Sequence, residues 1–269
     1  MSLLAPSRYR PVLIESWQKK VFNELKSGCI ICPAMKKLNG VKKSGGIWRK
    51  SPTKRSKIIR GVCSALKEEY GTPRLGNPRD PTDDLVYVIL SNRTLPGMSK
   101  KVYLELKKEF YPWSGILNKS KRYVEGILKP SGLSRIRSSQ LRESIKKIQR
   151  HFGEGGLKAL MGKRETEVLD FLTSLPGVSV KVAKCVMMYT LGFKVLPVDV
   201  HVFRISKRLG WTARTRADQC HDELEALVPA CMRYSYHVDC VAHGRLICRS
   251  EKPLCARCCI ASYCKYAKR

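Results

Sequence analysis

Four cysteines near the C-terminus have the residue type and spacing of a metal-ligand set. Cys248, Cys255, Cys258 and Cys264 are separated by six, two and five residues within CRSEKPLCARCCIASYC. A zinc ribbon usually has two C-x₂-C pairs about 15–20 residues apart, whereas this segment has one pair with uneven arms. Taking the adjacent Cys259 as the third ligand breaks the spacing. The pattern therefore favours one loop around an iron–sulfur cubane, with a zinc site as the alternative.

A second motif lies in FLTSLPGVSVKVAKCVMMYTLGF, residues 171–193. Pro176 cannot continue a helix, Gly177 permits a turn with positive φ, and Ser179 can cap the next helix. The exposed amides of such a turn, together with the helix dipole, form an anion site that suits a DNA phosphate and reads no sequence. We expect Gly177, Val178 and Ser179 to contact DNA, although many helix pairs turn through Pro-Gly.

The helices that must position these residues follow one another from about residue 58 onward. Amphipathic spacing places Ile59, Val62, Cys63 and Leu66 on one face, and Thr82 is the expected N-cap of the next helix. Further helices are expected at 98–111, 138–151, 164–173, 179–191, 198–209, 217–228 and 232–247. Alternating β-branched runs, a βαβ pattern and a Gly-rich phosphate loop are absent from the sequence. The chain is therefore expected to be all-α and to use no nucleotide cofactor.

The charge of the chain points to a polyanionic partner. Its 269 residues carry 52 Lys and Arg against 22 Asp and Glu, a formal net charge of +30. Nucleic acid is the favoured partner, bound with salt-sensitive affinity. An RNA-associated protein and one drawn to an anionic membrane surface are the alternatives.

The sequence contains no stretch of ~20 apolar residues and no apolar core of a secretory signal near its start. We expect an intracellular, DNA-associated protein, cytoplasmic or at the nucleoid in a prokaryote, that is not secreted and has no membrane partner. The Ser and Arg content of the opening residues leaves an organelle-targeting segment open. Twelve cysteines in such a chain favour metal binding over disulfides.

Three segments resemble the endonuclease III family of helix-hairpin-helix DNA glycosylases, and the likeness covers roughly residues 58–269. The cysteine loop and its lead-in HGRLIC (243–248) resemble the family's [4Fe-4S] cluster loop. LPGVSVKVA (175–183) resembles the hairpin signature, and VDVHVFRISKRLGW (198–211) is similar to the segment that begins with the family's catalytic Asp. The resemblance implies a structural [4Fe-4S] cluster held by the four cysteines, with Arg249, Lys252 and Arg257 presented to DNA.

The same resemblance makes Lys181 the nucleophile and Asp199 its catalytic partner. An amine attacks C1′ of a deoxyribose only when it is neutral, so the pKa of Lys181 must be lowered. Its place in the first turn of a helix, within a basic chain, is expected to lower it. Asp199 can stabilise positive charge on the sugar and assist proton transfer, or it can simply cap its helix. A Schiff base on Lys181 would allow β-elimination, which nicks the strand on the 3′ side.

The sequence departs from the family at several positions. LSNR (90–93) stands where the family has LSAQ, so Arg93 occupies the place of a residue that wedges into DNA. Arg93 is either this wedge or an ordinary surface arginine. Ser179 replaces a second Gly, and Val180 stands where a basic residue is common. The base that the pocket accepts is the least transferable property.

These expectations combine into a two-lobed, all-α helix-hairpin-helix glycosylase fold with a C-terminal iron–sulfur cluster loop. Residues 1–53 are a basic N-terminal extension, in which Cys29 and Cys32 form a lone C-x-x-C. Residues 54–81 and 194–269 form the cluster-bearing lobe, with the cluster loop at 248–264, and 82–193 form a helical barrel with the hairpin at 164–191. The remaining cysteines, at positions 63, 185, 220, 231 and 240, are expected to be small buried apolar residues.

The function expected from the sequence is that of a base-excision DNA glycosylase and abasic-site lyase, acting as a monomer on double-stranded DNA. An oxidised pyrimidine is the favoured substrate. The alternatives are a monofunctional mismatch or modified-pyrimidine glycosylase and, from another class, a non-catalytic iron–sulfur protein that binds DNA.

Overall fold

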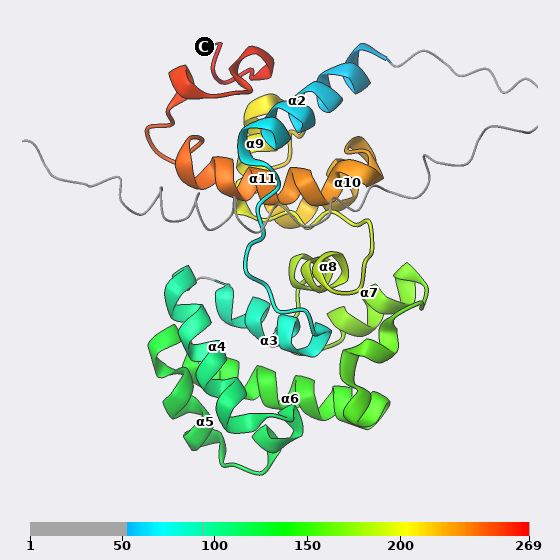
Figure 1. The fold of residues 1–269 in the computed structure, drawn as a ribbon, viewed down its shortest axis with the longest axis vertical. Coiled ribbons are helices and arrows are strands. Elements are labelled where there is room, and N and C mark those ends of the chain that lie inside the picture. Colours follow the sequence, from blue (N-terminus) through cyan, green and yellow to red (C-terminus); the bar gives the residue numbers. More distant parts are fainter. Residues whose placement is uncertain (1–52, 93, 269) are drawn as a thin grey trace, which may run out of the picture. The chain divides into compact units, whose positions relative to one another are not determined.

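The protein is described by a computed structural model of residues 53–92 and 94–268 (Figure 1). Residues 1–52, with the expected arm and the Cys29/Cys32 pair, lie outside the described residues, as does Arg93. Throughout the two described ranges the regular elements are α-helices and short 3₁₀ helices, without a strand. The all-α prediction is confirmed.

The described helices follow one another with short connections. The α-helices are α2 (Lys54–Tyr70), α3 (Pro81–Ser91), α4 (Pro96–Phe110), α5 (Lys121–Leu128), α6 (Ser134–Phe152), α7 (Glu165–Thr173), α8 (Val180–Tyr189), α9 (Val200–Leu209), α10 (His221–Leu227) and α11 (Arg233–Leu246). The 3₁₀ helices are η2 (Trp113–Leu117), η3 (Lys129–Ser131), η4 (Gly153–Leu160), η5 (Ala217–Gln219), η6 (Ala230–Met232), η7 (Cys255–Arg257) and η8 (Ala261–Tyr263).

One hydrophobic core is built from a continuous stretch of chain between α3 and the end of α8. Its members run from Leu85 to Val195 and include Phe110, Leu141 and Met187, each almost fully buried. Burying a side chain of this size contributes on the order of 1.5–3 kcal/mol. This core packs α3 and α7 against α8, the helix that carries Lys181.

A second core joins α2 to the C-terminal third of the chain. The predicted face of α2 is buried in it, and its partners come from α9, α10, α11 and the segment after α11. Helix α11 packs against both α2 and α9, and all three can be followed in Figure 1. Its members include Ile59, Leu66, Leu196, Ile205 and Tyr236. The division of the chain into domains at residues 53, 81 and 193 stays a prediction.

Local details of the helices differ from the sequence prediction. The N-cap of α3 is Asp80, not Thr82: Asp80 Oδ1 accepts hydrogen bonds from the amides of Thr82 and Asp83. Thr82 instead turns inward, and its Oγ1 accepts a hydrogen bond of 3.0 Å from the amide of Leu157. Helix α5, capped by Ser120, was not expected from the sequence. None of the described helices is long and apolar enough to cross a bilayer.

Candidate active site and metal centre

The turn between α7 and α8 is a hairpin whose backbone requires glycine at one position. Gly177 has a φ of +79°, and a Cβ added there would lie 2.5 Å from the Gln140 side chain of α6. Ser144, also on α6, donates from Oγ to the carbonyl of Pro176 at 3.1 Å. The turn is thus held against α6 in a conformation that favours Gly, and the predicted positive φ is confirmed.

Some backbone amides of this turn donate hydrogen bonds within the protein, and others are exposed. The Val178 amide donates to the Leu175 carbonyl at 3.1 Å, and the Val178 side chain is buried. Ser179 caps α8 as expected, its Oγ accepting from the amide of Val182 at 3.4 Å. Gly177 and Ser179 are exposed, and within residues 53–92 and 94–268 no acceptor binds their amides. Gly177 and Ser179, and not Val178, therefore offer free donors for an anion.

Lys181 is the second residue of α8, one turn before Cys185, and its side chain is half-buried. Its pKa lies above the ordinary value, because Cys185, Asp199 and Asp84 raise it more than desolvation lowers it. Burial raises the pKa of the Cys185 thiol to about 11, so this thiol is neutral at pH 7. At neutral pH the two carboxyl groups therefore favour the charged form of the amine.

This direction is the opposite of the sequence prediction for Lys181. The N-terminal turn of α8 and the excess of positive charge in the chain were expected to lower the pKa of the amine. In the structure Cys185 raises this pKa most, and Asp199 and Asp84 add to its effect, so that together they outweigh the lowering by desolvation.

Asp199 is the N-cap of α9, as the capping interpretation allowed. Its Oδ1 accepts hydrogen bonds from the amides of His201 at 2.9 Å and Val202 at 2.8 Å. In the described part of the chain no hydrogen bond reaches Oδ2. One carboxylate oxygen therefore fixes the side chain while the other is available, so capping and a catalytic role are compatible.

The segment that joins α8 to α9 sets the position of Asp199 relative to Lys181. The Leu196 amide donates to Glu225 Oε2 at 2.7 Å, and the Pro197 carbonyl lies 2.9 Å from Nδ1 of the buried His237. Asp199 lies near enough to Lys181 to raise the pKa of its amine. The catalytic role of the two residues stays a prediction.

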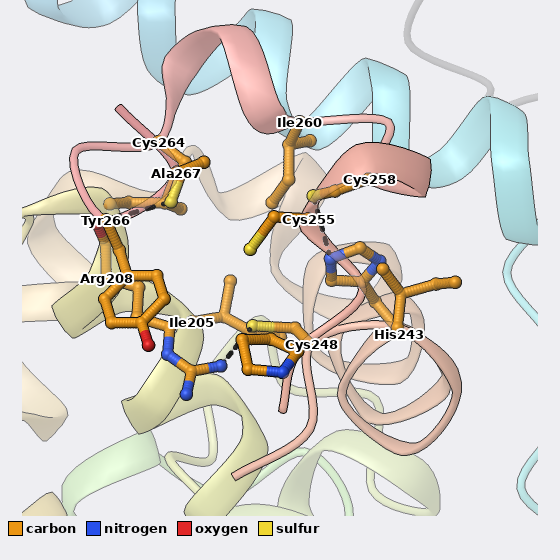
Figure 2. Close-up of a pocket in the computed structure, with 13 residues that line it drawn as sticks. Ile205, Arg208, His243, Cys248, Cys255, Cys258, Ile260, Cys264, Tyr266 and Ala267 are labelled. Carbon is orange, nitrogen blue, oxygen red and sulfur yellow. Dashed lines mark hydrogen bonds between the residues drawn. The ribbon is translucent and has the colours of Figure 1, made fainter. Parts of the chain in front are cut away.

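The four predicted ligand cysteines border a single cavity at the C-terminus (Figure 2). Apolar side chains from α9, α11 and the final loop complete its lining, among them Ile205, Leu209, Ile247, Ile260 and Ala267. Cys259 is not part of this lining, so the cavity selects Cys258 of the adjacent pair. Among residues 53–92 and 94–268 no three His, Cys, Asp or Glu side chains are grouped closely enough to hold a metal ion. The four thiols nevertheless line one cavity, which is the arrangement that a shared metal group needs.

Nitrogen atoms of Arg208 and His243 lie within hydrogen-bonding distance of two cysteine sulfurs around this cavity. Arg208 Nη1 lies 3.1 Å from Cys248 Sγ, and His243 Nε2 lies 3.4 Å from Cys258 Sγ (Figure 2). Tyr70, from α2, orients His243 through a 2.8 Å hydrogen bond between its hydroxyl and Nδ1. Donors of this kind stabilise thiolates that bind a metal group.

Sequence reasoning missed the roles of Arg208, His243 and Asp84. Arg204 and Arg208 are four residues apart on α9, a spacing that places both on one face, and this signal was available in the sequence. His243 had been noted only as part of a motif. Asp84 was given no role from the sequence, although its neighbours in DLVYVIL are apolar, which indicates a buried position.

The other cysteines follow the prediction with one exception. Cys63, Cys185, Cys220 and Cys240 are buried in the two cores. Cys231 is exposed, because it lies in the short 3₁₀ helix η6 before α11 and not on a packed helical face.

Comparison with known families identifies residues 86–230 as a match to the HhH-GPD superfamily of base excision DNA repair proteins. The chain is 31% identical over 199 residues to endonuclease III of Thermotoga maritima, covering 73% of this chain and 88% of that protein. It is also 28% identical over 171 residues to a candidate DNA glycosylase of Arabidopsis thaliana. That match spans 63% of this chain and 58% of the plant protein.

The fold is similar to that of an endonuclease III solved in a non-covalent complex with DNA. The TM-score is 0.70 at 21% identity, with 79% of this chain and 96% of that chain covered. The helical arrangement, the hairpin and the family match over more than half of the sequence agree with one another. The chain is therefore an endonuclease III-like member of the HhH-GPD superfamily of base excision DNA repair glycosylases.

Proposed function

We propose that this protein excises a damaged or modified base from double-stranded DNA, an oxidised pyrimidine above all, and then nicks the strand 3′ to the abasic site. The observation that carries this proposal is the meeting of Lys181, at the start of α8, with Asp199, at the start of α9. Lys181 supplies a primary amine, and Asp199 supplies a carboxylate with one oxygen already fixed by the helix.

In the proposed reaction the neutral Lys181 amine forms a bond to C1′ of the target nucleotide, and the base departs with the electron pair of the glycosidic bond. Asp199 stabilises the positive charge that develops on the sugar. The nitrogen of the resulting aminal gives up a proton and the C1′–O4′ bond breaks, with O4′ taking up a proton, so that the opened sugar carries a Schiff base. The Schiff base acidifies the 2′ position, and loss of a 2′ proton expels the 3′ phosphate by β-elimination. Base release and strand cleavage then come from one site.

Two surfaces are proposed to hold the DNA backbone. The exposed amides of Gly177 and Ser179 are donors for one phosphate at the N-terminus of α8. Arg249, Lys252 and Arg257 are exposed on the cysteine loop and offer charges to further phosphates. Arg93 keeps its proposed role as a residue that fills the space left by the extruded base.

Cys248, Cys255, Cys258 and Cys264 are the proposed ligands of a [4Fe-4S] cluster, because their thiols border one apolar cavity. When bound, the cluster cross-links residues 248–264 through four thiolates and so holds the basic loop in shape. The contacts of Arg208 and His243 with two of the sulfurs support thiolate ligands at these positions.

The experiment that tests the function is borohydride trapping on duplexes that carry oxidised, deaminated, alkylated or abasic sites. Wild-type protein is expected to form a covalent adduct and to nick the substrate without alkali. Lys181→Ala should abolish the adduct, whereas Lys194→Ala, which removes an exposed lysine nearby, should retain it. A full adduct yield with Lys181→Ala would refute the nucleophile assignment.

A monofunctional glycosylase is the second candidate, favoured by one observation. The raised pKa of Lys181 keeps its amine protonated, and a protonated amine forms no Schiff base. In that case Asp199 would activate water, base release would appear only after alkali treatment, and borohydride would trap nothing. Failure to release any base from the panel would instead support a non-catalytic DNA-binding protein.

A further inference from the structure

Arg137, on α6, is a buried arginine that is held by neutral oxygen atoms. The residue is 3% exposed. Its Nη1 donates to Thr94 Oγ1 at 2.9 Å and to the carbonyl of Ser131 at 2.7 Å, and its Nη2 donates to the carbonyl of Asn92. None of the ion pairs in the described part of the chain includes Arg137. Burying a charge beside neutral acceptors costs stability, so the presence of this arginine needs an explanation.

The oxygen atoms that bind Arg137 belong to two connections far apart in the sequence. Asn92 and Thr94 lie between α3 and α4, whereas Ser131 is the last residue of η3, shortly before α6. Thr94 Oγ1 also donates to the Ser131 carbonyl at 3.0 Å, so the two connections are joined directly as well as through the arginine. Helix α3 packs against α4 and α6, and all three can be followed in Figure 1. A guanidinium group can fix several acceptors at once, because its N–H donors lie in one plane.

The helices that begin at this junction lack side-chain caps. Leu95 precedes α4 and Leu133 precedes α6, and neither side chain accepts a hydrogen bond from its helix. Leu133 also has a φ of +52°, a conformation that costs free energy for a residue with a side chain. Helix α3 ends at the extended residue Asn92, whose carbonyl is one of those that bind Arg137. The arginine thus supplies from the interior a constraint that local capping does not supply.

Two large apolar side chains next to these contacts are exposed. Leu95 is 78% exposed and Leu133 is 54% exposed. A leucine that is exposed at an N-cap position contributes neither buried area nor a cap hydrogen bond, so stability does not explain these residues. Exposed apolar side chains on joined loops are typical of a binding surface. Together Thr94, Leu95, Ser131 and Leu133 form a clamped edge.

We infer that Arg137 is a positioning residue for nucleotide extrusion: its guanidinium holds the clamped edge in one conformation before DNA arrives, so that the target nucleotide leaves the duplex against a preformed surface. The inference rests on the proposed function, in which Arg93, between Asn92 and Thr94 in the sequence, fills the space left by the extruded base. Arg137 is buried, so it acts only through the residues that it holds. A surface that is ordered in advance loses no conformational freedom during extrusion, and extrusion is therefore faster.

The test is the fluorescence of 2-aminopurine placed next to a stable tetrahydrofuran abasic site in a duplex. This fluorescence depends on base stacking, so its change after mixing with excess full-length protein follows extrusion. No bond is cleaved, so the measurement does not depend on Lys181. Arg137→Met removes the guanidinium and keeps an unbranched side chain, and the change should be roughly five- to twenty-fold slower than with wild type. Thr94→Val keeps the shape of the residue and removes its hydroxyl, and it should slow the change by about two- to five-fold.

Arg142→Met is the matched control. Arg142 is also on α6, and its Nη1 donates to the carbonyls of Ile116 and Lys119, at a connection that is not part of the clamped edge. This variant should extrude the nucleotide at the wild-type rate. Circular dichroism checks that each variant is folded, and Thr94→Val decides the question if Arg137→Met is not.

Two results would overturn the inference and leave the proposed function standing, since borohydride trapping tests that function separately. One is a wild-type rate in Thr94→Val and in folded Arg137→Met. The other is a decrease in Arg142→Met as large as that in Arg137→Met, which would reflect general loosening of α6. If wild type binds the duplex, as fluorescence anisotropy measures, but leaves the 2-aminopurine signal unchanged, no nucleotide is extruded. The proposed function then falls together with the inference.

Discussion

Lys184 and Glu225 form a buried ion pair that joins α8 to α10. Nζ of Lys184 lies 2.8 Å from Oε2 of Glu225, and their side chains are 4% and 15% exposed. The same Oε2 accepts the amide of Leu196, within the segment that runs from α8 to Asp199. One carboxylate therefore fixes both the helix of the proposed nucleophile and the segment leading to its partner.

Removing this carboxylate should be costly. Glu225→Ala leaves the buried Lys184 ammonium only the exposed carboxylate of Asp222, whose Oδ1 lies 3.8 Å away, and the expected loss is about 3–5 kcal/mol of unfolding free energy. Urea unfolding followed by circular dichroism measures it. The double variant Lys184→Met/Glu225→Met should recover part of the loss, because it removes the buried Lys184 charge, while Arg233 still lacks the carboxylate that lies 3.5 Å from its Nη1. A loss below about 1 kcal/mol for Glu225→Ala would contradict the assigned role.

Substitutions of Asp199 should separate helix capping from chemistry. Asn can still accept hydrogen bonds from the amides of His201 and Val202, so Asp199→Asn should keep the stability of α9. It removes the charge that stabilises the sugar, and single-turnover base release should fall by about 10²–10³-fold. Asp199→Ala should lose activity and also about 1 kcal/mol of stability. Near wild-type rates with Asp199→Asn would leave Asp199 as a cap alone.

The adjacent pair Cys258 and Cys259 offers a matched test of the metal centre. Cys258 borders the cavity and Cys259 does not. Cys258→Ala purified without air should lose most of its iron and its visible absorbance, whereas Cys259→Ala should retain both. Iron and sulfide analysis of the two variants measures the difference. Loss of iron from Cys259→Ala instead would show that the assigned ligand set is wrong. Zinc in place of iron in the wild-type protein would favour the alternative, a zinc site.

Asp239 should make the protein less stable as the pH rises. Burial raises its pKa to about 7, although both carboxylate oxygens are within hydrogen-bonding distance of Thr72. Between the unfolded pKa of ~3.9 and about 7, the folded state holds a proton that the unfolded state has lost. The contribution to stability is therefore full below the lower value and falls as the pH rises through this window.

Asp239→Asn removes this titration and should flatten the decrease. The measurement is urea unfolding of wild type and Asp239→Asn at several pH values between about 5 and 8. An equal slope in the two proteins would show that Asp239 is not protonated in the folded state.

The sequence alone was sufficient to predict features that depend on residues close together along the chain. Gly177 and Ser179 form the turn and cap that their residue types favour. The spacing of the four cysteines is sufficient for one loop to bring them to a single cavity. The buried face of α2 follows from its apolar spacing.

Features that depend on contacts between residues distant in sequence could not be predicted. The direction of the Lys181 pKa shift depends on the packing around the amine: Cys185 raises the pKa most, Asp199 and Asp84 from distant parts of the sequence add to it, and helix position alone gave the wrong sign. The prediction of Thr82 as the N-cap of α3 was wrong for a related reason. Thr82 is a good N-cap residue, but the interior offers its hydroxyl the amide of Leu157, and Asp80 followed by Pro81 supplies the cap instead.

The second core has a consequence for the order of events during synthesis. Its first strip of apolar side chains is on α2, and the rest appears only after Leu196. A nascent chain leaving the ribosome can complete the core between Leu85 and Val195 first, since that stretch is continuous. During this interval the apolar face of α2 has no partner from the second core and is exposed to binding by a chaperone. The lobe that begins the described chain is thus the last to close.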